Sequence, residues 1–108
     1  MKKLYKEIPE MTFFTGDTLP IFVIEVNREK LDDCKMKMVI SRVKPPEENV
    51  IVKDCGKDGN CFSVHLWSLD TKNLTAGTYR ISFIMTDKIG LKYVKLSGLM
   101  HVRSLTEG

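Results

Sequence analysis

Two cysteines, Cys55 and Cys61, are the residues with the most evident chemical potential in this sequence. On strands paired directly across a hairpin, facing residues lie about 4.5–5.5 Å apart at Cα, which is within reach of a disulfide. With His65 the two cysteines supply three of the four ligands of a structural zinc ion, but no Cys-x-x-Cys pair preorganises them. Cys34 makes the number of cysteines odd, which favours free thiols in a reducing compartment.

The same segment carries oxygen ligands that could attract calcium, namely Asp54, Asp58 and Asn60. Calcium-binding loops are closed by a bidentate glutamate, and this segment has none. An Asp-Gly pair such as Asp58-Gly59 is instead a common turn of a β-hairpin. We therefore expect residues 53–61 to form a polar hairpin without a metal site.

Neither histidine stands in a sequence context that predicts catalysis. His65 and His101 alternate away from the apolar faces of their expected strands, so we expect both to be solvated. The carboxylate pairs at 32–33 and 47–48 are adjacent in turn-like segments, which places them in solvent and not in a cleft that would separate their pKa values. No cysteine lies in a glycine-bounded nucleophile turn. We predict no catalytic residue, no cofactor and a protein that is not an enzyme.

The composition is that of an ordinary globular domain, with 108 residues of which 43% are hydrophobic and 29% charged. A net charge of +3 is too small to indicate a nucleic-acid partner, and the glycine motifs that bind phosphate do not occur. We see neither a signal peptide nor a stretch of about 20 apolar residues that would span a membrane. We therefore expect one cytoplasmically synthesised domain over 1–108, with its core at 11–103, extensions at 1–9 and 104–108, and no nucleic-acid or membrane partner.

The elements that position any site are β-strands, because hydrophobic residues recur mostly with a period of two. The only helical signal is a single turn within 68–74. Strands are expected near residues 11–15, 19–26, 35–44, 49–54, 60–67, 77–87, 91–97 and 99–103. Without helices the second layer must be another sheet, so the predicted fold class is all-β, a sandwich of seven to eight antiparallel strands.

A turn followed by Gly-x-Tyr, formed by Leu74, Gly77 and Tyr79, resembles the tyrosine corner of Greek-key immunoglobulin-like (Ig-like) domains. In that corner the phenol bonds a backbone group a few residues upstream, and Tyr79 would make this bond. Ile81 stands where antibody domains have a cysteine, two residues after the tyrosine. The predicted sandwich is therefore Ig-like and lacks the inter-sheet disulfide.

Apolar residues in excess of what one core needs predict a protein interface. Residues 19–26 are apolar on both faces, and further apolar side chains fall on the polar sides of their strands. The expected interface residues are Phe22, Ile24, Val39, Val43 and Ile84. Trp67 has two interpretations, an exposed platform on which a sugar stacks or an indole that plugs the end of the sandwich; we favour the plug because tryptophan is usually well buried.

Four short motifs together resemble a known family: FTGDTL at 14–19, LDTKNLTAGTY at 69–79, DKIG at 87–90 and GLMHV at 98–102. Their order is similar to that in small Ig-like modules of tailed-phage and prophage structural proteins, most closely the N-terminal domain of upper baseplate proteins, over residues 12–103. The resemblance implies a virion-associated assembly protein that docks on other virion components and forms homo-oligomers, with no catalytic residues to transfer. A carbohydrate- or surface-binding sandwich of an exported bacterial protein is the alternative function.

Overall fold

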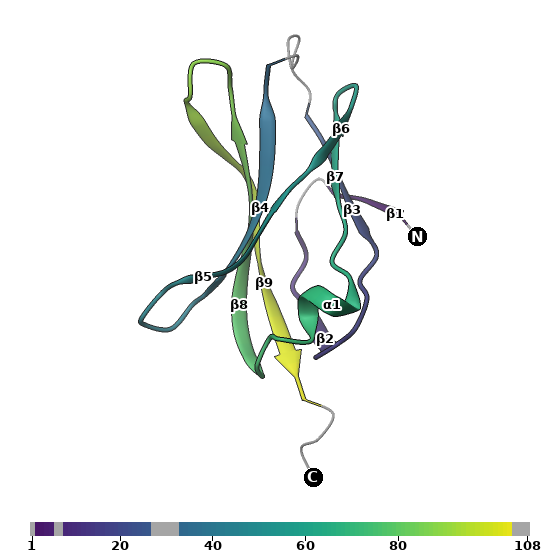
Figure 1. The fold of residues 1–108 in the computed structure, drawn as a ribbon, viewed down its shortest axis with the longest axis vertical. Helices are drawn as coiled ribbons and strands as arrows, with labels where there is room; N and C mark the ends of the chain where they lie inside the picture. The colour runs from purple at the N-terminus through teal and green to yellow at the C-terminus, as the bar shows by residue number, and fades with distance from the viewer. Residues whose placement is uncertain (1, 6–7, 27–32, 105–108) are drawn as a thin grey trace.

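The computed structural model describes residues 2–5, 8–26 and 33–104, and this part of the chain forms two β-sheets and one short helix (Figure 1). The smaller sheet has the order β1-β3-β7-β6 and consists of β1 (Lys2–Tyr5), β3 (Ile21–Glu25), β7 (Cys61–Val64) and β6 (Gly56–Asp58). The larger sheet has the order β2-β9-β8-β4-β5 and consists of β2 (Met11–Phe14), β9 (Lys92–Arg103), β8 (Gly77–Thr86), β4 (Lys35–Arg42) and β5 (Asn49–Asp54). The helix α1 (Ser68–Thr71) follows β7.

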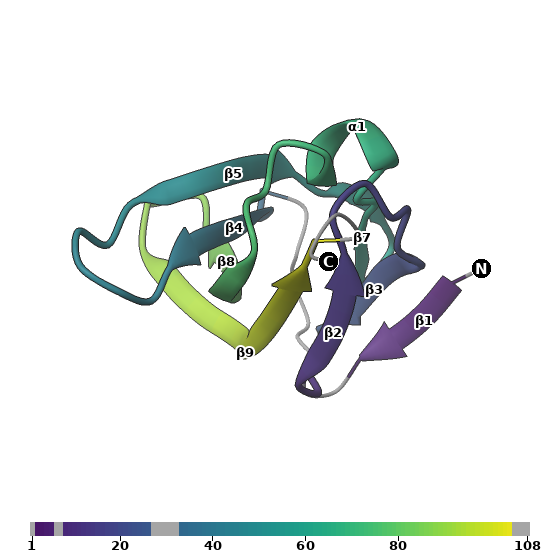
Figure 2. The same ribbon diagram turned by 90° about the horizontal axis from the view of Figure 1, so that it is seen from below.

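The two sheets form separate layers, as the view along the long axis shows (Figure 2). Strands β4 and β8 bury every second side chain between the layers, because successive residues of a strand point to opposite faces of its sheet. Phe22 of β3 and Phe83 of β8 meet there, with ring centroids 5.8 Å apart. The predicted all-β sandwich is confirmed.

The strand directions differ from the prediction, because the sheets are mixed and not purely antiparallel. β1 pairs in parallel with β3, and β2 pairs in parallel with β9. β1 also lies within residues 1–9, which we expected to be an extension without a strand. Hydrophobic alternation identifies a strand but carries no information on the direction of its neighbour, so the sequence could not specify these two pairings.

Two strands expected at 91–97 and 99–103 are one continuous strand, β9. Gly98, which separates the two expected strands and which we took as their turn, lies inside β9 opposite Ile81 of β8. A Cβ atom at position 98 would lie only 2.6 Å from Cγ2 of Ile8, so the glycine is needed for close approach and not for a turn.

The chain passes from the larger sheet to the smaller one between β5 and β6, at Cys55. The Cys55 N–H donates to the Met36 carbonyl of β4 at 2.9 Å, and β6 then pairs with β7. The expected hairpin is present, but its turn is Gly59-Asn60, one residue later than predicted. Gly59 has φ +63°, the value required at the first central position of a type II′ turn.

The segment after β7 contains the expected helical turn, α1, followed by the tyrosine-corner residues. The Tyr79 hydroxyl donates to the Thr75 carbonyl at 2.8 Å, which is the bond expected of a tyrosine corner. Leu74 is buried beside it, and its carbonyl accepts a 3.0 Å hydrogen bond from the Thr15 hydroxyl. Gly77 is the first residue of β8.

Candidate interaction surface

The outer face of the larger sheet carries an apolar centre. Alternation in β4 turns Met38 and Ile40 into the core and Val39 outward, and the same alternation in β8 turns Ile84 outward. In the register of the sheet Val39 lies opposite Val52 of β5 on one side and Ser82 of β8 on the other. The face therefore has short side chains at its middle.

Ser97 of β9 extends this row across the sheet. It pairs with Ser82, and the two hydroxyl oxygens lie 3.4 Å apart. Val52, Val39, Ser82 and Ser97 thus form one row across four strands, which we call the small-residue row. Ile84 is diagonal to Val39, because it pairs with Lys37 two residues earlier in β4. Short side chains in this row leave room for side chains of another protein surface to pack against the sheet.

Charged residues surround this centre. Lys37 forms an ion pair with Asp54 of β5, with 3.9 Å between Nζ and Oδ1. Lys35 and Arg80 also lie on exposed positions of β4 and β8. An apolar centre within a charged border is the usual arrangement of a protein interface.

The structure places the five predicted interface residues in different environments. Val39 and Ile84 lie half-buried on the outer face, and Val43 follows the end of β4. The prediction was wrong for Phe22 and Ile24, which are 1% and 2% exposed in the core between the sheets. Sequence analysis missed Val52, which is 51% exposed, although it lies two positions after half-buried Val50 in a predicted strand.

Trp67 forms a second candidate site at the end of β7. Its indole is 55% exposed, so our preferred interpretation as a buried plug was wrong. The ring lies against the His65 imidazole, with centroids 3.9 Å apart and the two planes tilted by 48°. The Trp67 backbone N–H donates to Asp70 Oδ2 at 2.8 Å and so fixes the main chain at this position. Contact with His65 therefore supports the indole while much of its surface stays open to solvent.

An ion pair fixes the helix beside Trp67. Lys53 Nζ lies 2.8 Å from Asp70 Oδ2 and donates a second hydrogen bond of 2.8 Å to the His65 carbonyl. Desolvation raises the pKa of the Asp70 carboxyl, but the hydrogen bonds from Lys53 and the Trp67 N–H outweigh this effect and hold the pKa below its usual value. Lys53 thereby connects β5 of the larger sheet to α1.

The two histidines are half-buried and hydrogen-bonded, and not freely solvated as we expected. His65 Nε2 bonds the Leu19 carbonyl, while its Nδ1 is buried without a hydrogen-bond partner in the described structure. His101 Nδ1 lies 3.1 Å from the Thr78 hydroxyl, and its Nε2 bonds Glu10. In the described part of the chain, the hydrogen bonds of the two histidines go to the Leu19 carbonyl, the Thr78 hydroxyl and Glu10, and none of these joins a histidine to a cysteine or serine.

Cys55 and Cys61 are not joined by a disulfide, and Cys34 is buried. The β6–β7 register pairs Cys61 with Asp58 and not with Cys55. Burial, with a smaller contribution from the charge of Asp54, raises the pKa of the Cys55 thiol to about 12. Within residues 2–5, 8–26 and 33–104, no three His, Cys, Asp or Glu side chains gather as a metal site would require. Of the carboxylates expected in solvent, Asp33, Glu47 and Glu48 are exposed, while Asp32 lies outside the described residues.

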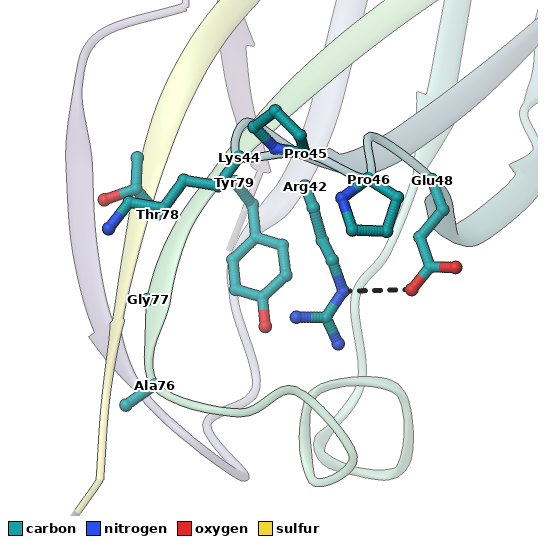
Figure 3. Close-up of a pocket in the computed structure, with 9 residues that line it drawn as sticks. All are labelled: Arg42, Lys44, Pro45, Pro46, Glu48, Ala76, Gly77, Thr78 and Tyr79. Carbon is teal, nitrogen blue, oxygen red and sulfur yellow. Dashed lines mark ion pairs between the residues drawn. The ribbon is translucent and has the colours of Figure 1, made fainter.

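A pocket of about 410 Å³ lies between the β4–β5 loop and the start of β8 (Figure 3). Its charged groups include Arg42 and Glu48, which pair with each other at 3.2 Å between Nε and Oε1. The lining residues are Arg42, Lys44, Pro45, Pro46, Glu48, Ala76, Gly77, Thr78 and Tyr79. Tyr79 is bonded to Thr75 and Arg42 is paired with Glu48, so both groups already have a partner within the fold.

No protein-family model matches this chain, and no curated protein matches its sequence significantly. Within the described residues, no helix has the length and hydrophobicity needed to cross a membrane.

Proposed function

We propose that this protein is a non-enzymatic interaction module that assembles with protein partners, including its own copies, through the outer face of the larger sheet. The observation that carries the proposal is the small-residue row with Ile84 beside it, an apolar centre bordered by charged side chains. Two such faces can pack against each other as sheets do in a sandwich, with their side chains in contact.

We further propose the Ig-like Greek-key topology and a role in assembly of a phage or prophage virion, at the baseplate or tail. The smaller sheet has the strand order β1-β3-β7-β6, and four neighbouring strands of the larger sheet have the order β9-β8-β4-β5. Both orders match those of the two sheets of variable-type Ig domains, which supports the topology. The parallel pairing of β1 with β3 departs from the antiparallel pairing of those sheets.

Contacts between two of the motifs that resemble the baseplate family also support this role. The Thr71 hydroxyl donates to the Asp17 carbonyl at 2.7 Å, and the Thr15 hydroxyl donates to the Leu74 carbonyl at 3.0 Å. The segments at 14–19 and 69–79 therefore bond each other on either side of one corner. A shared corner gives these two distant motifs a structural reason to occur together.

Affinity capture with the products of neighbouring genes tests the assembly role. The immobilised protein should retain one of these products, and Val39→Glu should release it because a carboxylate at the centre of the face would be buried unpaired. Leu69→Glu is the matched control, since Leu69 is exposed on α1, outside the strands that form the face. The proposal fails if no product is retained, or if Val39→Glu and Leu69→Glu retain it equally.

Carbohydrate binding is the second candidate function, and the exposure of Trp67 favours it. An indole supported by contact with His65, on a main chain fixed by Asp70, could stack on a sugar ring at little cost in side-chain entropy. Because Trp67 is the single tryptophan, its fluorescence reports directly on a ligand. Titration with the sugars that bind on a glycan array should shift this emission, and Trp67→Ala should abolish binding. A silent array would remove this candidate.

A further inference from the structure

The loop between β8 and β9 exposes an unusual concentration of apolar surface. Ile89 is 72% exposed, Leu91 52% and Tyr93 36%. We call these three residues the apolar tip. They lie within five positions of one another at the end of the longest hairpin, which reaches the end of the molecule opposite the C-terminus (Figure 1).

The apolar tip is held in one shape by Asp87. One carboxylate oxygen, Oδ1, accepts hydrogen bonds from the N–H groups of Ile89 at 3.1 Å and Leu91 at 3.0 Å. The other oxygen, Oδ2, accepts a bond from the Tyr93 hydroxyl at 3.3 Å. Gly90, with φ +87°, permits the tight bend between the two exposed apolar residues. The tip is therefore preorganised, so little conformational entropy would be lost on binding.

The charges around the apolar tip are mainly positive. Lys88 precedes Ile89 and Lys92 follows Leu91, and both lysines are exposed. Lys35 of β4 pairs with Thr86 at the base of the hairpin. On the acidic side, Asp87 is engaged within the loop and Asp33 precedes β4. A ligand for this tip should therefore be apolar inside and negatively charged at its surface.

We propose that the apolar tip binds peripherally to the surface of an anionic phospholipid bilayer. Ile89 and Leu91 enter the boundary between headgroups and acyl chains, while the phenol of Tyr93 stays at the headgroup level, where amphipathic rings are favoured. Lys88 and Lys92 extend their ammonium groups to the lipid phosphates and carboxylates. The apolar side chains project from a convex hairpin end, a shape suited to insertion into a fluid surface.

This contact is different in kind from a membrane span. The expectation that the protein has no membrane partner came from the lack of a long apolar stretch, which excludes crossing and not insertion of a loop at the interface. The proposal also stands apart from the assembly function, because the apolar tip does not include the small-residue row.

Vesicle flotation tests the proposal. The whole protein is mixed with vesicles of phosphatidylcholine containing about 30% phosphatidylserine, and in parallel with pure phosphatidylcholine. We expect a partition coefficient about tenfold higher on the anionic vesicles, because both lysines gain from the negative surface. Lys88→Gln/Lys92→Gln should remove most of this difference.

The apolar contribution is tested with Ile89→Asp/Leu91→Asp, which should lower binding to anionic vesicles at least about tenfold. Leu69→Asp/Asn73→Asp introduces the same charge change at exposed positions elsewhere and should bind much more tightly than the tip variant. Circular dichroism checks that each variant folds.

In a Trp67→Phe background, Ile89→Trp should shift its emission to the blue on anionic vesicles. The proposal is overturned if the wild-type protein does not bind the vesicles. The remaining ligand for the tip would then be a pocket of another protein. Equal binding by the two double aspartate variants overturns the proposal as well, because the attraction would then come from overall charge alone.

Discussion

The corner before β8 depends on one hydroxyl group, that of Tyr79. This hydroxyl donates to the Thr75 carbonyl from a ring that is almost fully buried. Tyr79→Phe should lower the free energy of unfolding by about 1–2 kcal/mol, because it removes the bond and leaves a carbonyl without its donor. Urea denaturation measures the loss.

Tyr93→Phe is the matched control for Tyr79→Phe. It also removes a phenolic hydroxyl, but from an exposed position where water can replace the bond to Asp87. It should cost less than about 0.5 kcal/mol. Equal losses in the two variants would show that the corner bond contributes nothing specific.

Asp70 should make stability depend on pH in the acid range. Its pKa is lowered in the folded state, so the stability it contributes is fully present above the pKa of the unfolded chain and is lost as the pH falls through the folded-state pKa. Asp70→Asn should therefore flatten the loss of stability below about pH 4. Denaturation midpoints measured against pH test this expectation.

Lys53→Met should flatten the same curve, since it removes the cation that holds the pKa of Asp70 down. An acid dependence identical in the wild type and both variants would contradict the role given to this ion pair.

Cys55 should react slowly with thiol reagents. Its pKa is raised to about 12, so almost none of the thiol is ionised at neutral pH, and the thiolate is the reactive form. Alkylation with iodoacetamide near pH 8, followed by mass spectrometry, should label Cys61 at least about tenfold faster than Cys55. Equal labelling rates would contradict the buried environment of Cys55.

Among the elements, three strands of the larger sheet and the helical turn follow most directly from the sequence. β4, β5 and β8 lie where hydrophobic alternation predicts them, and α1 lies within the predicted helical turn. β6 has three exposed residues and no alternation that could reveal it. Gly98 was wrongly assigned to a turn, because the sequence alone does not distinguish a glycine that forms a turn from one that leaves room for a neighbouring side chain.

The close approach at Gly98 gives a test of how β9 packs against the segment before β2. Gly98→Ala should lower the free energy of unfolding by about 1–3 kcal/mol, because the new methyl group would overlap Ile8, whose carbonyl oxygen is 3.0 Å and Cγ2 2.6 Å away. Thermal and urea denaturation measure this loss.

Gly56→Ala is the control for Gly98→Ala, since the nearest atom to its new Cβ is 3.7 Å away, an ordinary contact. If Gly98→Ala were no more destabilising than Gly56→Ala, Ile8 would not lie against β9 as described.

For the molecule as a whole, the predicted interface residues were correctly placed only on strands that have one polar face. Val39 and Ile84 could be assigned to the outer face because the residues two positions before and after each of them, on the same face of the strand, are polar. Residues 19–26 are apolar on both faces, so alternation could not say which face meets the core, and Phe22 and Ile24 were assigned to the wrong one. Val52 was missed because its exposure depends on β5 being the edge of the sheet.

Light scattering after size-exclusion chromatography tests most directly whether the outer face of the larger sheet joins copies of the chain. The protein should elute with a mass that is a multiple of 12.4 kDa, and Val39→Glu should elute as a monomer while Leu69→Glu keeps the wild-type mass. A wild-type protein that stays at 12.4 kDa up to millimolar concentration, or a Val39→Glu variant that associates as the wild type does, would contradict the account.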